Sequence, residues 1–300
     1  MRLLEQLKKN NIIVLDGGLA TTLESYGCNL NSSLWSSEVL ISEPEKVKDA
    51  HQAFTNAGAD IVITSTYQAS FPTFKEKGLS NNEIIHLYEN AIDAIKHATS
   101  NQQTIVGSLG PYGAHLSNGS EYTGAYHLSS DEYFNFHHER IDTLIRLGIY
   151  DFVFETIPSF SEIKAIVENI IPHYSSDYSF WLSITVNKNG DLSDGTPLDK
   201  VCTYIKNHTQ QVPIFGINCS SISSINHSIE KGLLNVPQAV ALYPNGGATY
   251  NPLTKKWSTN ENHDDLFEVI PSWIKQDVKI IGGCCQVSPH DIKKIKSIIK

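Results

Sequence analysis

Short apolar runs of seven to nine residues recur along the chain and alternate with longer amphipathic stretches. The runs are rich in branched side chains, and such runs are typical of parallel strands that are buried on both faces. Eight runs fit this pattern. They predict strands at Ile12–Gly18, Ala59–Tyr67, Gln103–Gly110, Tyr150–Thr156, Phe180–Val186, Val212–Cys219, Gln238–Asn245 and Val278–Cys285.

Segments with the period of a helix lie between these runs. The stretch from Pro44 to Gly58 is an example, with proline in the first turn and glycine at the stop. Strict alternation of strand and helix predicts a parallel sheet, and eight repeats favour closure into a barrel over an open doubly wound sheet. No G-x-G-x-x-G follows the first strand, so a dinucleotide-binding domain has little support. We predict an α/β protein in which residues 1–300 form one (β/α)8 TIM barrel domain.

Composition and charge narrow the class of function. The chain has 32 Asp and Glu against 23 Lys and Arg, a formal charge of −9 at pH 7. This balance argues against a nucleic-acid binder, which carries a basic stripe or patch, and favours small-molecule substrates. We find no membrane-spanning stretch, and the charged N-terminal segment lacks the apolar core of a signal peptide, so a cytoplasmic location is expected. The sequence does not determine the oligomeric state.

Three of the five cysteines stand at the ends of predicted strands. Cys219 ends the sixth strand, while Cys284 and Cys285 end the eighth, so the barrel brings three thiols to one edge. Thiolates suit Zn²⁺, and three protein ligands leave a fourth tetrahedral position for water or substrate, as in catalytic zinc sites. We therefore predict that these three cysteines bind zinc. Cys28 and Cys202 lie away from strand ends and are predicted to be small buried side chains.

The cysteines have one redox alternative. A disulfide between the neighbours Cys284 and Cys285 would make a switch, but bridging adjacent residues strains the backbone and leaves Cys219 unexplained. The spacing of the five cysteines is not that of a regular disulfide framework. We therefore expect free thiols in a reducing compartment.

Two carboxylates follow predicted strands and are candidates to bind a cation or to act as acid and base. Asp16 ends the first strand, and its alternative role is to cap the next helix. Glu155 ends the fourth strand, where a buried carboxylate needs a partner such as a substrate ammonium. His137 and His138 lie in a helical stretch without an H-E-x-x-H pattern, so zinc ligation of the hydrolase type has little support.

A long loop follows the third predicted strand. It runs from Gly110 to Tyr126 and is dense in Gly and Tyr, which fits the cover of an active site better than a plain connector. Gly17 and Gly18 allow a sharp turn or the close approach of a ligand. Aromatic candidates to face a cationic ligand are Trp35, Tyr67, Tyr112, Tyr122 and Tyr126.

At these residues the sequence resembles the homocysteine S-methyltransferase family, which includes S-methylmethionine-dependent and betaine-dependent enzymes. The resemblance covers nearly the whole chain, and its most specific part is the combination of GINC and GGCC. The matching motifs are LDGGLATTLESYG (15–27), TSTYQAS (64–70), SLGPYGAHLSNGSEYTGAY (108–126), FETIPS (154–159), SDGTPL (193–198), GINC (216–219), YPNGG (243–247) and IIGGCC (280–285).

The resemblance implies zinc-dependent methyl transfer to the thiolate of L-homocysteine, giving methionine. The short chain resembles the branch that uses S-methylmethionine, with S-adenosylmethionine as a further donor. Asp16 and Glu155 would hold the homocysteine amino group, and the loop Gly110 to Tyr126 would cover the donor. The full set of predicted substrate-binding residues is Asp16, Gly17, Gly18, Tyr67, Gln68, Tyr112, Glu155 and Asn218.

Several alternatives stay open at this point. A betaine-linked or corrinoid-linked thiol methyltransferase would use the same thiolates, and the corrinoid type would need a partner chain because no cobalamin-binding segment is present. A zinc hydrolase on the same barrel would activate water instead, and a thiol-binding or zinc-storage protein would bind without turnover. Two positions depart from the family: Gln286 stands where Arg is common, and Gly246 where many members have Ser. Both bear on substrate orientation and neither removes a ligand.

Overall fold

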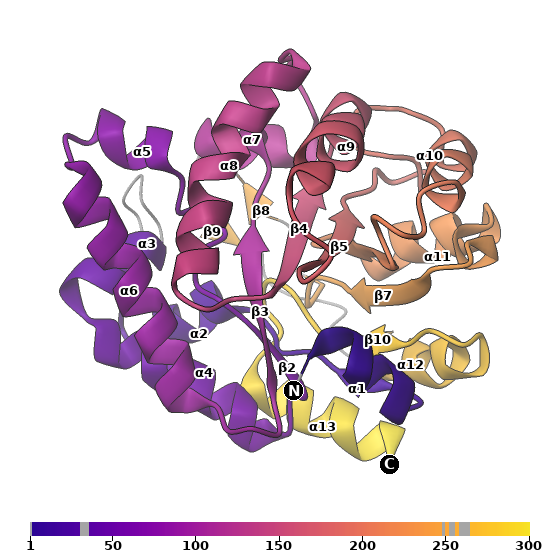
Figure 1. Ribbon diagram of the computed structural model, residues 1–300. Helices are drawn as coiled ribbons and strands as arrows, with labels where there is room; N and C mark the ends of the chain where they lie inside the picture. Colours follow the sequence, from indigo (N-terminus) through magenta and orange to yellow (C-terminus); the bar gives the residue numbers. More distant parts are fainter. Residues whose placement is uncertain (1, 31–35, 248–249, 252–255, 258–264) are drawn as a thin grey trace.

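Eight parallel strands form one sheet in the order β1-β10-β7-β6-β5-β4-β3-β2. A bridge between Leu15 and Ile61 joins its two outer members, so the ladder closes on itself, and helices surround it (Figure 1). The structure is a computed structural model that describes residues 2–30, 36–247, 250–251, 256–257 and 265–300. The predicted (β/α)8 barrel is confirmed.

Each of the eight predicted runs overlaps one barrel strand, although the fourth strand ends one residue after its run and the fifth begins one residue before its run. Apart from the fourth, the strands are shorter than the runs, because the polar residues at the carboxyl ends leave the ladder and face the barrel mouth. The bounds are β1 Ile13–Val14, β2 Ile61–Ile63, β3 Thr104–Leu109, β4 Asp151–Ile157, β5 Ser179–Ile184, β6 Ile214–Asn218, β7 Ala239–Tyr243 and β10 Ile280–Ile281. A separate antiparallel pair, β8 Tyr250–Asn251 and β9 Lys256–Trp257, follows β7.

Helices separate the strands and cover the outside of the barrel (Figure 1). The α-helices are α1 Leu3–Lys9, α2 Leu19–Ser25, α3 Ser36–Ser42, α4 Pro44–Ala57, α5 Phe71–Glu76, α6 Asn81–Ala98, α7 Tyr112–His115, α8 Ser130–Arg146, α9 Phe160–Ala165, α10 Leu198–Lys206, α11 Ile222–Glu230, α12 Asp265–Lys275 and α13 Pro289–Ile299. Shorter turns of helix are η1 Ser120–Tyr122, the π-helical η2 Ile166–Ile170, η3 Ile171–His173 and η4 Leu233–Asn235.

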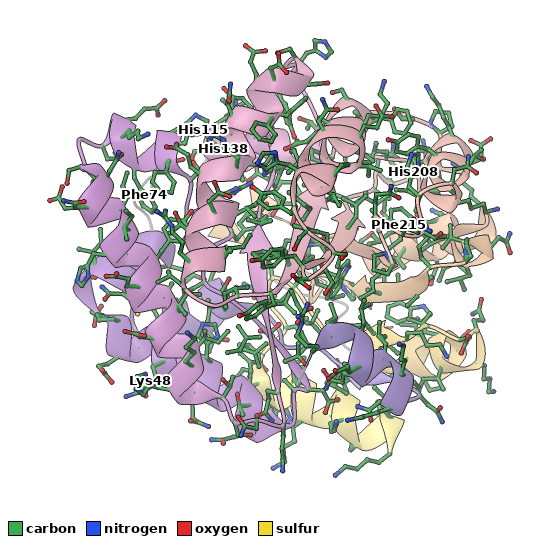
Figure 2. The ribbon with its side chains drawn as sticks, viewed as in Figure 1. Lys48, Phe74, His115, His138, His208 and Phe215 are labelled. Carbon is green, nitrogen blue, oxygen red and sulfur yellow. A yellow bond between two sulfur atoms is a disulfide. The ribbon has the colours of Figure 1, made fainter. Side chains whose placement is uncertain are left out.

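Helix α4 illustrates how local sequence sets these bounds. Pro44 occupies the first turn, where its missing N–H costs no hydrogen bond, and Gly58 ends the helix with a left-handed φ of 101°. The predicted stretch from Pro44 to Gly58 is therefore confirmed. Its apolar face packs inward, while charged side chains such as Lys48 lie at the outer edge of the molecule (Figure 2).

Two apolar clusters hold the barrel together. The larger fills the space between the sheet and the helices, and the smaller lies inside the barrel around the fully buried Trp181. Leu3 of α1 belongs to the inner cluster and is fully buried. In the part of the chain that the structure describes, no helix is long and apolar enough to cross a membrane.

Candidate active site

A cavity of about 140 Å³ lies where the carboxyl ends of the barrel strands meet. This end of the barrel is where enzymes of this fold carry their chemistry, because the loops after the strands are free to vary. The lining residues come from the ends of seven strands, from the start of α2 and from η1. They are Asp16, Gly17, Gly18, Leu19, Ala20, Thr21, Ile63, Thr64, Ser65, Tyr67, Gln68, Ser108, Glu121, Tyr122, Glu155, Thr156, Cys219, Tyr243, Gly283, Cys284 and Cys285.

Most of the predicted site residues line this cavity, and two do not. Asn218 is fully buried behind the wall and hydrogen-bonds to Thr156 instead. Tyr112 begins α7, where its ring packs against Phe136 and Tyr126. Of the other aromatic candidates, Tyr67 and Tyr122 line the cavity, Tyr126 does not, and Trp35 falls outside the described residues.

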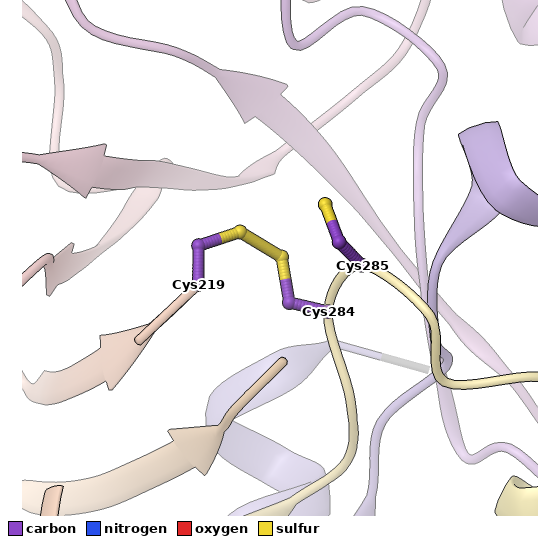
Figure 3. A group of neighbouring side chains, drawn as sticks. All are labelled: Cys219, Cys284 and Cys285. Carbon is purple, nitrogen blue, oxygen red and sulfur yellow. A yellow bond between two sulfur atoms is a disulfide. The ribbon is translucent and has the colours of Figure 1, made fainter. Parts of the chain in front are cut away.

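The three strand-end cysteines meet at the cavity, but they are not all free thiols. Cys219 and Cys284 form a disulfide with their Cα atoms 5.4 Å apart, and Cys285 keeps its thiol (Figure 3). The expectation of free thiols at all three positions is therefore not met in this structure, and the alternative bridge between Cys284 and Cys285 is wrong. The two bridged cysteines meet over the end of β7, which lies between β6 and β10: the Cys219 N–H donates to the Tyr243 carbonyl and the Cys284 N–H to the Pro244 carbonyl.

Once reduced, the same three sulfur atoms fit a single metal ion. They lie within 4.8 Å of one another, and tetrahedral zinc with bonds of about 2.3 Å needs sulfur atoms about 3.8 Å apart. All three residues also line the cavity, so a fourth ligand would come from a bound molecule. Thiolate donors select soft metals such as zinc over oxygen-seeking Mg²⁺ or Ca²⁺.

The Cys285 thiol stays protonated in the structure as it stands. Burial raises its pKa to about 12, and the negative charges of Glu155, Glu24 and Glu121 act in the same direction. A thiol in this setting is a poor nucleophile and a poor ligand until a cation compensates the local charge.

Asp16 belongs to the seam between β1 and β2. Its Oδ2 accepts a hydrogen bond from the Ile63 N–H at 2.8 Å, and the side chain is 6% exposed. Burial raises the pKa of this carboxyl well above its usual value, and the nearby Glu155 adds to the rise. Helix α2 begins after Gly18 without a side-chain cap, so the alternative role of Asp16 as a helix cap is not observed.

Glu155 points into the cavity from an irregular strand end. The pairing of β4 with β5 shifts register between Phe154 and Ile157, and Thr156 adopts a left-handed φ of 64°. Such a bulge re-aims the side chains beside it. Burial raises the pKa of Glu155 to about 7, against the opposing effect of a hydrogen bond from the Ser108 hydroxyl.

Glu121 is a cavity residue that the strand-end reasoning missed. It lies in η1, in the loop predicted to cover the site, and its side chain is nearly buried. Burial raises its pKa to about 7. The loop that carries Glu121 was predicted to cover the site because of its Gly and Tyr content. Its sequence pattern gave no reason to expect Glu121 in the cavity rather than on the surface.

Close backbone contacts join the two ends of the sequence at the site. A Cβ atom on Gly18 would lie 2.8 Å from the Cys284 carbonyl oxygen, so glycine is needed there for lack of space. At the two positions that depart from the related family, Gly246 donates its N–H to the Cys285 carbonyl and Gln286 adopts a left-handed φ of 67°. Neither position lines the cavity.

The remaining candidates lie elsewhere, as predicted. Cys28 and Cys202 are buried thiols outside the cavity. His137 is fully buried and hydrogen-bonds to Glu162, while His138 bonds to carbonyls of its own helix. Among the described residues that line the cavity, the charged groups are all acidic. This arrangement suits a thiol substrate at the cysteines and a cation beside the carboxylates.

Comparison with known proteins agrees with this chemistry. The homocysteine S-methyltransferase family model matches residues 13–299. Homocysteine S-methyltransferase YbgG of Bacillus subtilis (strain 168) is 37% identical over 296 residues, which cover 95% of this chain and 93% of the relative. The Escherichia coli (strain K12) homocysteine S-methyltransferase is 36% identical over 303 residues, covering 97% and 96%.

Solved structures give the same result. The crystal structure of the homocysteine methyltransferase MmuM from Escherichia coli, metallated form, matches with a TM-score of 0.85 at 33% identity and covers 98% of each chain. Its oxidized form also matches with a TM-score of 0.85, at 34% identity and 97% coverage of each chain.

Proposed function

The chain belongs to the homocysteine S-methyltransferase family, and from this we propose that it transfers a methyl group from S-methylmethionine to L-homocysteine with zinc as its metal. The observation that carries the proposal is the meeting of Cys219, Cys284 and Cys285 at a cavity whose charged groups are carboxylates. The methylated acceptor and the demethylated donor would both be methionine.

The three cysteines would hold the metal after the disulfide is reduced. Bound there, zinc would lower the pKa of the homocysteine thiol, so that the substrate reacts as a thiolate. The protein must keep the disulfide open for this role, because a sulfur atom in a disulfide is not an anionic ligand. An external thiol reductant would supply the two electrons.

Asp16 and Glu155 would bind the homocysteine ammonium group. Both carboxylates line the cavity, and each already accepts one hydrogen bond that fixes its direction, from the Ile63 N–H and from the Ser108 hydroxyl. An ammonium ion beside them would favour their charged forms and offset the cost of burial. With its ammonium group held there, homocysteine would have its sulfur at a fixed distance from the carboxylates, toward the three cysteines.

Transfer itself needs alignment more than acid catalysis. The homocysteine sulfur forms a bond to the methyl carbon as the bond from that carbon to the donor sulfonium breaks, and the electron pair stays on the donor sulfur. The leaving group is a neutral thioether, so no proton has to be supplied to it. Holding the two substrates in line is the main contribution expected of the cavity walls.

The test is methionine formation by freshly reduced, zinc-loaded protein given homocysteine. S-methylmethionine, S-adenosylmethionine and betaine are supplied in parallel, each with a no-enzyme control. Two methionines formed for each S-methylmethionine consumed would support the proposed donor. Turnover with betaine alone would keep the chemistry and overturn the donor, and bound zinc without turnover on any donor would overturn the proposed function.

A further inference from the structure

The Glu121 carboxylate is delivered to the cavity by a tightly held turn. Its segment η1 begins after Gly119, and the Asn118 side chain accepts a hydrogen bond from the Ser120 N–H at 3.0 Å. A Cβ atom on Gly113 would lie 2.6 Å from the Glu121 nitrogen, so the loop packs on itself without space for a side chain there. The Thr185 hydroxyl also donates to the Glu121 carbonyl at 3.3 Å. The position of this acid is therefore fixed before any ligand binds.

One oxygen of this carboxylate has no hydrogen-bond partner. Glu121 is 9% exposed, and its Oε2 is buried without a donor among the residues that the structure describes. Leaving a buried carboxylate oxygen unpaired is costly, and proteins accept the cost mainly at functional sites. Backbone hydrogen bonds from Glu121 and Gly119 act on this carboxylate and lower its pKa, but they leave Oε2 without a donor.

The surroundings of Glu121 suit a cation. Glu121 lines the same cavity as Tyr67 and as Cys285, one of the cysteines beside which the reacting sulfur is expected. Tyr67 and Tyr122 also line this cavity, and aromatic faces attract cations. None of the described lining residues is Lys, Arg or His, so no protein cation neutralises this acid within the cavity.

Resting on the function proposed above, we propose that Glu121 recognises the positive charge of the methyl donor, pairing its unpartnered oxygen with the sulfonium centre. The residue thereby sets the preference of the site for cationic over uncharged side chains of the same shape. Asp16 and Glu155 are left for the homocysteine ammonium group.

This role has a kinetic signature. The sulfonium charge disappears as the methyl group leaves, so a carboxylate beside it stabilises the bound donor more than the transition state. Removing that carboxylate should raise the KM for the donor without lowering kcat, which should stay unchanged or rise. The neutral product methionine loses the contact, which helps it to leave.

The experiment compares Glu121→Gln with the unaltered, reduced and zinc-loaded protein. S-methylmethionine is assayed as donor, and homoleucine, its uncharged carbon isostere, is assayed as a competitive inhibitor. We expect the donor KM to rise roughly ten- to hundredfold, because an attraction between opposite charges in a largely buried cavity is lost, while the KM for homocysteine and the inhibition constant of homoleucine change less than threefold. Glu24→Gln is the matched control, since Glu24 also acts electrostatically on Cys285 but is exposed and lies outside the cavity lining.

Each outcome separates the two proposals. No methyl transfer by the unaltered protein overturns the proposed function itself. An active protein in which Glu121→Gln leaves the donor KM unchanged, or weakens S-methylmethionine and homoleucine equally, overturns the role of Glu121 alone. Glu121→Asp retains the charge, so it should keep the preference for S-methylmethionine over homoleucine even if its kcat falls, and loss of that preference would also contradict the inference.

Discussion

Asn218 binds Thr156 through both ends of its amide. Its Oδ1 accepts a hydrogen bond from the Thr156 N–H, and its Nδ2 donates to the Thr156 Oγ1, each at 2.8 Å. These bonds hold Thr156 in a left-handed conformation that is uncommon for a branched residue. The bulge they hold directs Glu155 into the cavity. Asn218 therefore shapes the site from behind its wall, although the sequence predicted it as a substrate contact.

Replacing this amide should disturb stability and substrate binding together. Asn218→Ala leaves the buried Thr156 N–H without a partner, which costs about 2 kcal/mol in the free energy of unfolding. Urea denaturation measures that loss, and the KM for homocysteine should rise because Glu155 is no longer held. Asn207→Ala removes an exposed hydrogen bond from a side-chain amide to the Thr203 carbonyl, and it should change neither the stability nor the KM. An Asn218→Ala protein with unaltered stability would show that the bulge supports itself.

The cysteine cluster should bind zinc only when all three thiols are present and reduced. In reduced protein, Cys219→Ala or Cys285→Ala should lose both bound zinc and methyl transfer, because two thiolates make an incomplete site. Elemental analysis of zinc per chain and methionine formation measure the two effects. Cys202→Ala removes a buried thiol outside the cavity and should keep both. Full turnover by Cys285→Ala would remove the basis of the proposed function.

A buried carboxylate away from the cavity should make stability depend on pH. Glu162 is fully buried, and it accepts hydrogen bonds from the Tyr112 N–H at 3.0 Å and from the Tyr126 hydroxyl at 2.5 Å. Burial raises its pKa from 4.5 to about 7, although the two hydrogen bonds and the charge of Arg140 oppose the rise. The folded state thus binds the proton more tightly than the unfolded state.

The contribution of this carboxyl to stability is complete below pH 4.5 and is lost as pH rises through about 7. Glu162→Gln removes the titration, while an amide oriented with its oxygen at the Oε1 position can keep the bonds from Tyr112 and His137. We expect the Tm of this variant to fall less than that of the unaltered protein between pH 5 and pH 8. Glu230→Gln, at an exposed position, should follow the unaltered protein. Parallel curves for Glu162→Gln and the unaltered protein would contradict the prediction.

Gly18 should be needed for metal binding although it supplies no ligand. An alanine there places a Cβ atom 2.8 Å from the Cys284 carbonyl oxygen, so the backbone that carries Cys284 and Cys285 must move. We expect Gly18→Ala to bind zinc roughly tenfold more weakly, a loss typical of residues that orient metal ligands. Competition with a chromogenic chelator measures the affinity.

The matched control for this prediction is Gly78→Ala. Gly78 has a left-handed φ of 85° and open space around its Cα, so alanine costs about 1 kcal/mol of stability through the backbone alone. Its zinc affinity should equal that of the unaltered protein. Equal zinc affinity in Gly18→Ala would show that the contact with Cys284 is not needed for the site.

Sequence reasoning located the barrel strands and most of the cavity because both depend on local pattern. A buried parallel strand needs a continuous apolar run, and in this fold the residues after each run meet at one end of the barrel. Asp16, Glu155 and the three cysteines could therefore be predicted to converge on one site without coordinates. The strand bounds were less accurate, since the ladder of β10 ends at Ile281 and leaves Gly283 and the paired cysteines free to turn into the site.

The sequence by itself determined the fold and the kinds of side chain at its mouth, because an apolar period is a property of neighbouring residues. Tertiary structure alone decided which side chains pair. The disulfide joins Cys219 to Cys284 across 65 residues because β6 and β10 flank β7. Asn218 bonds to Thr156 instead of lining the cavity, because the bulge in β4 comes within reach of its amide. Glu121 enters the cavity because Gly113 permits close packing of the loop. These contacts depend on distances between segments far apart in the chain, which no local pattern encodes.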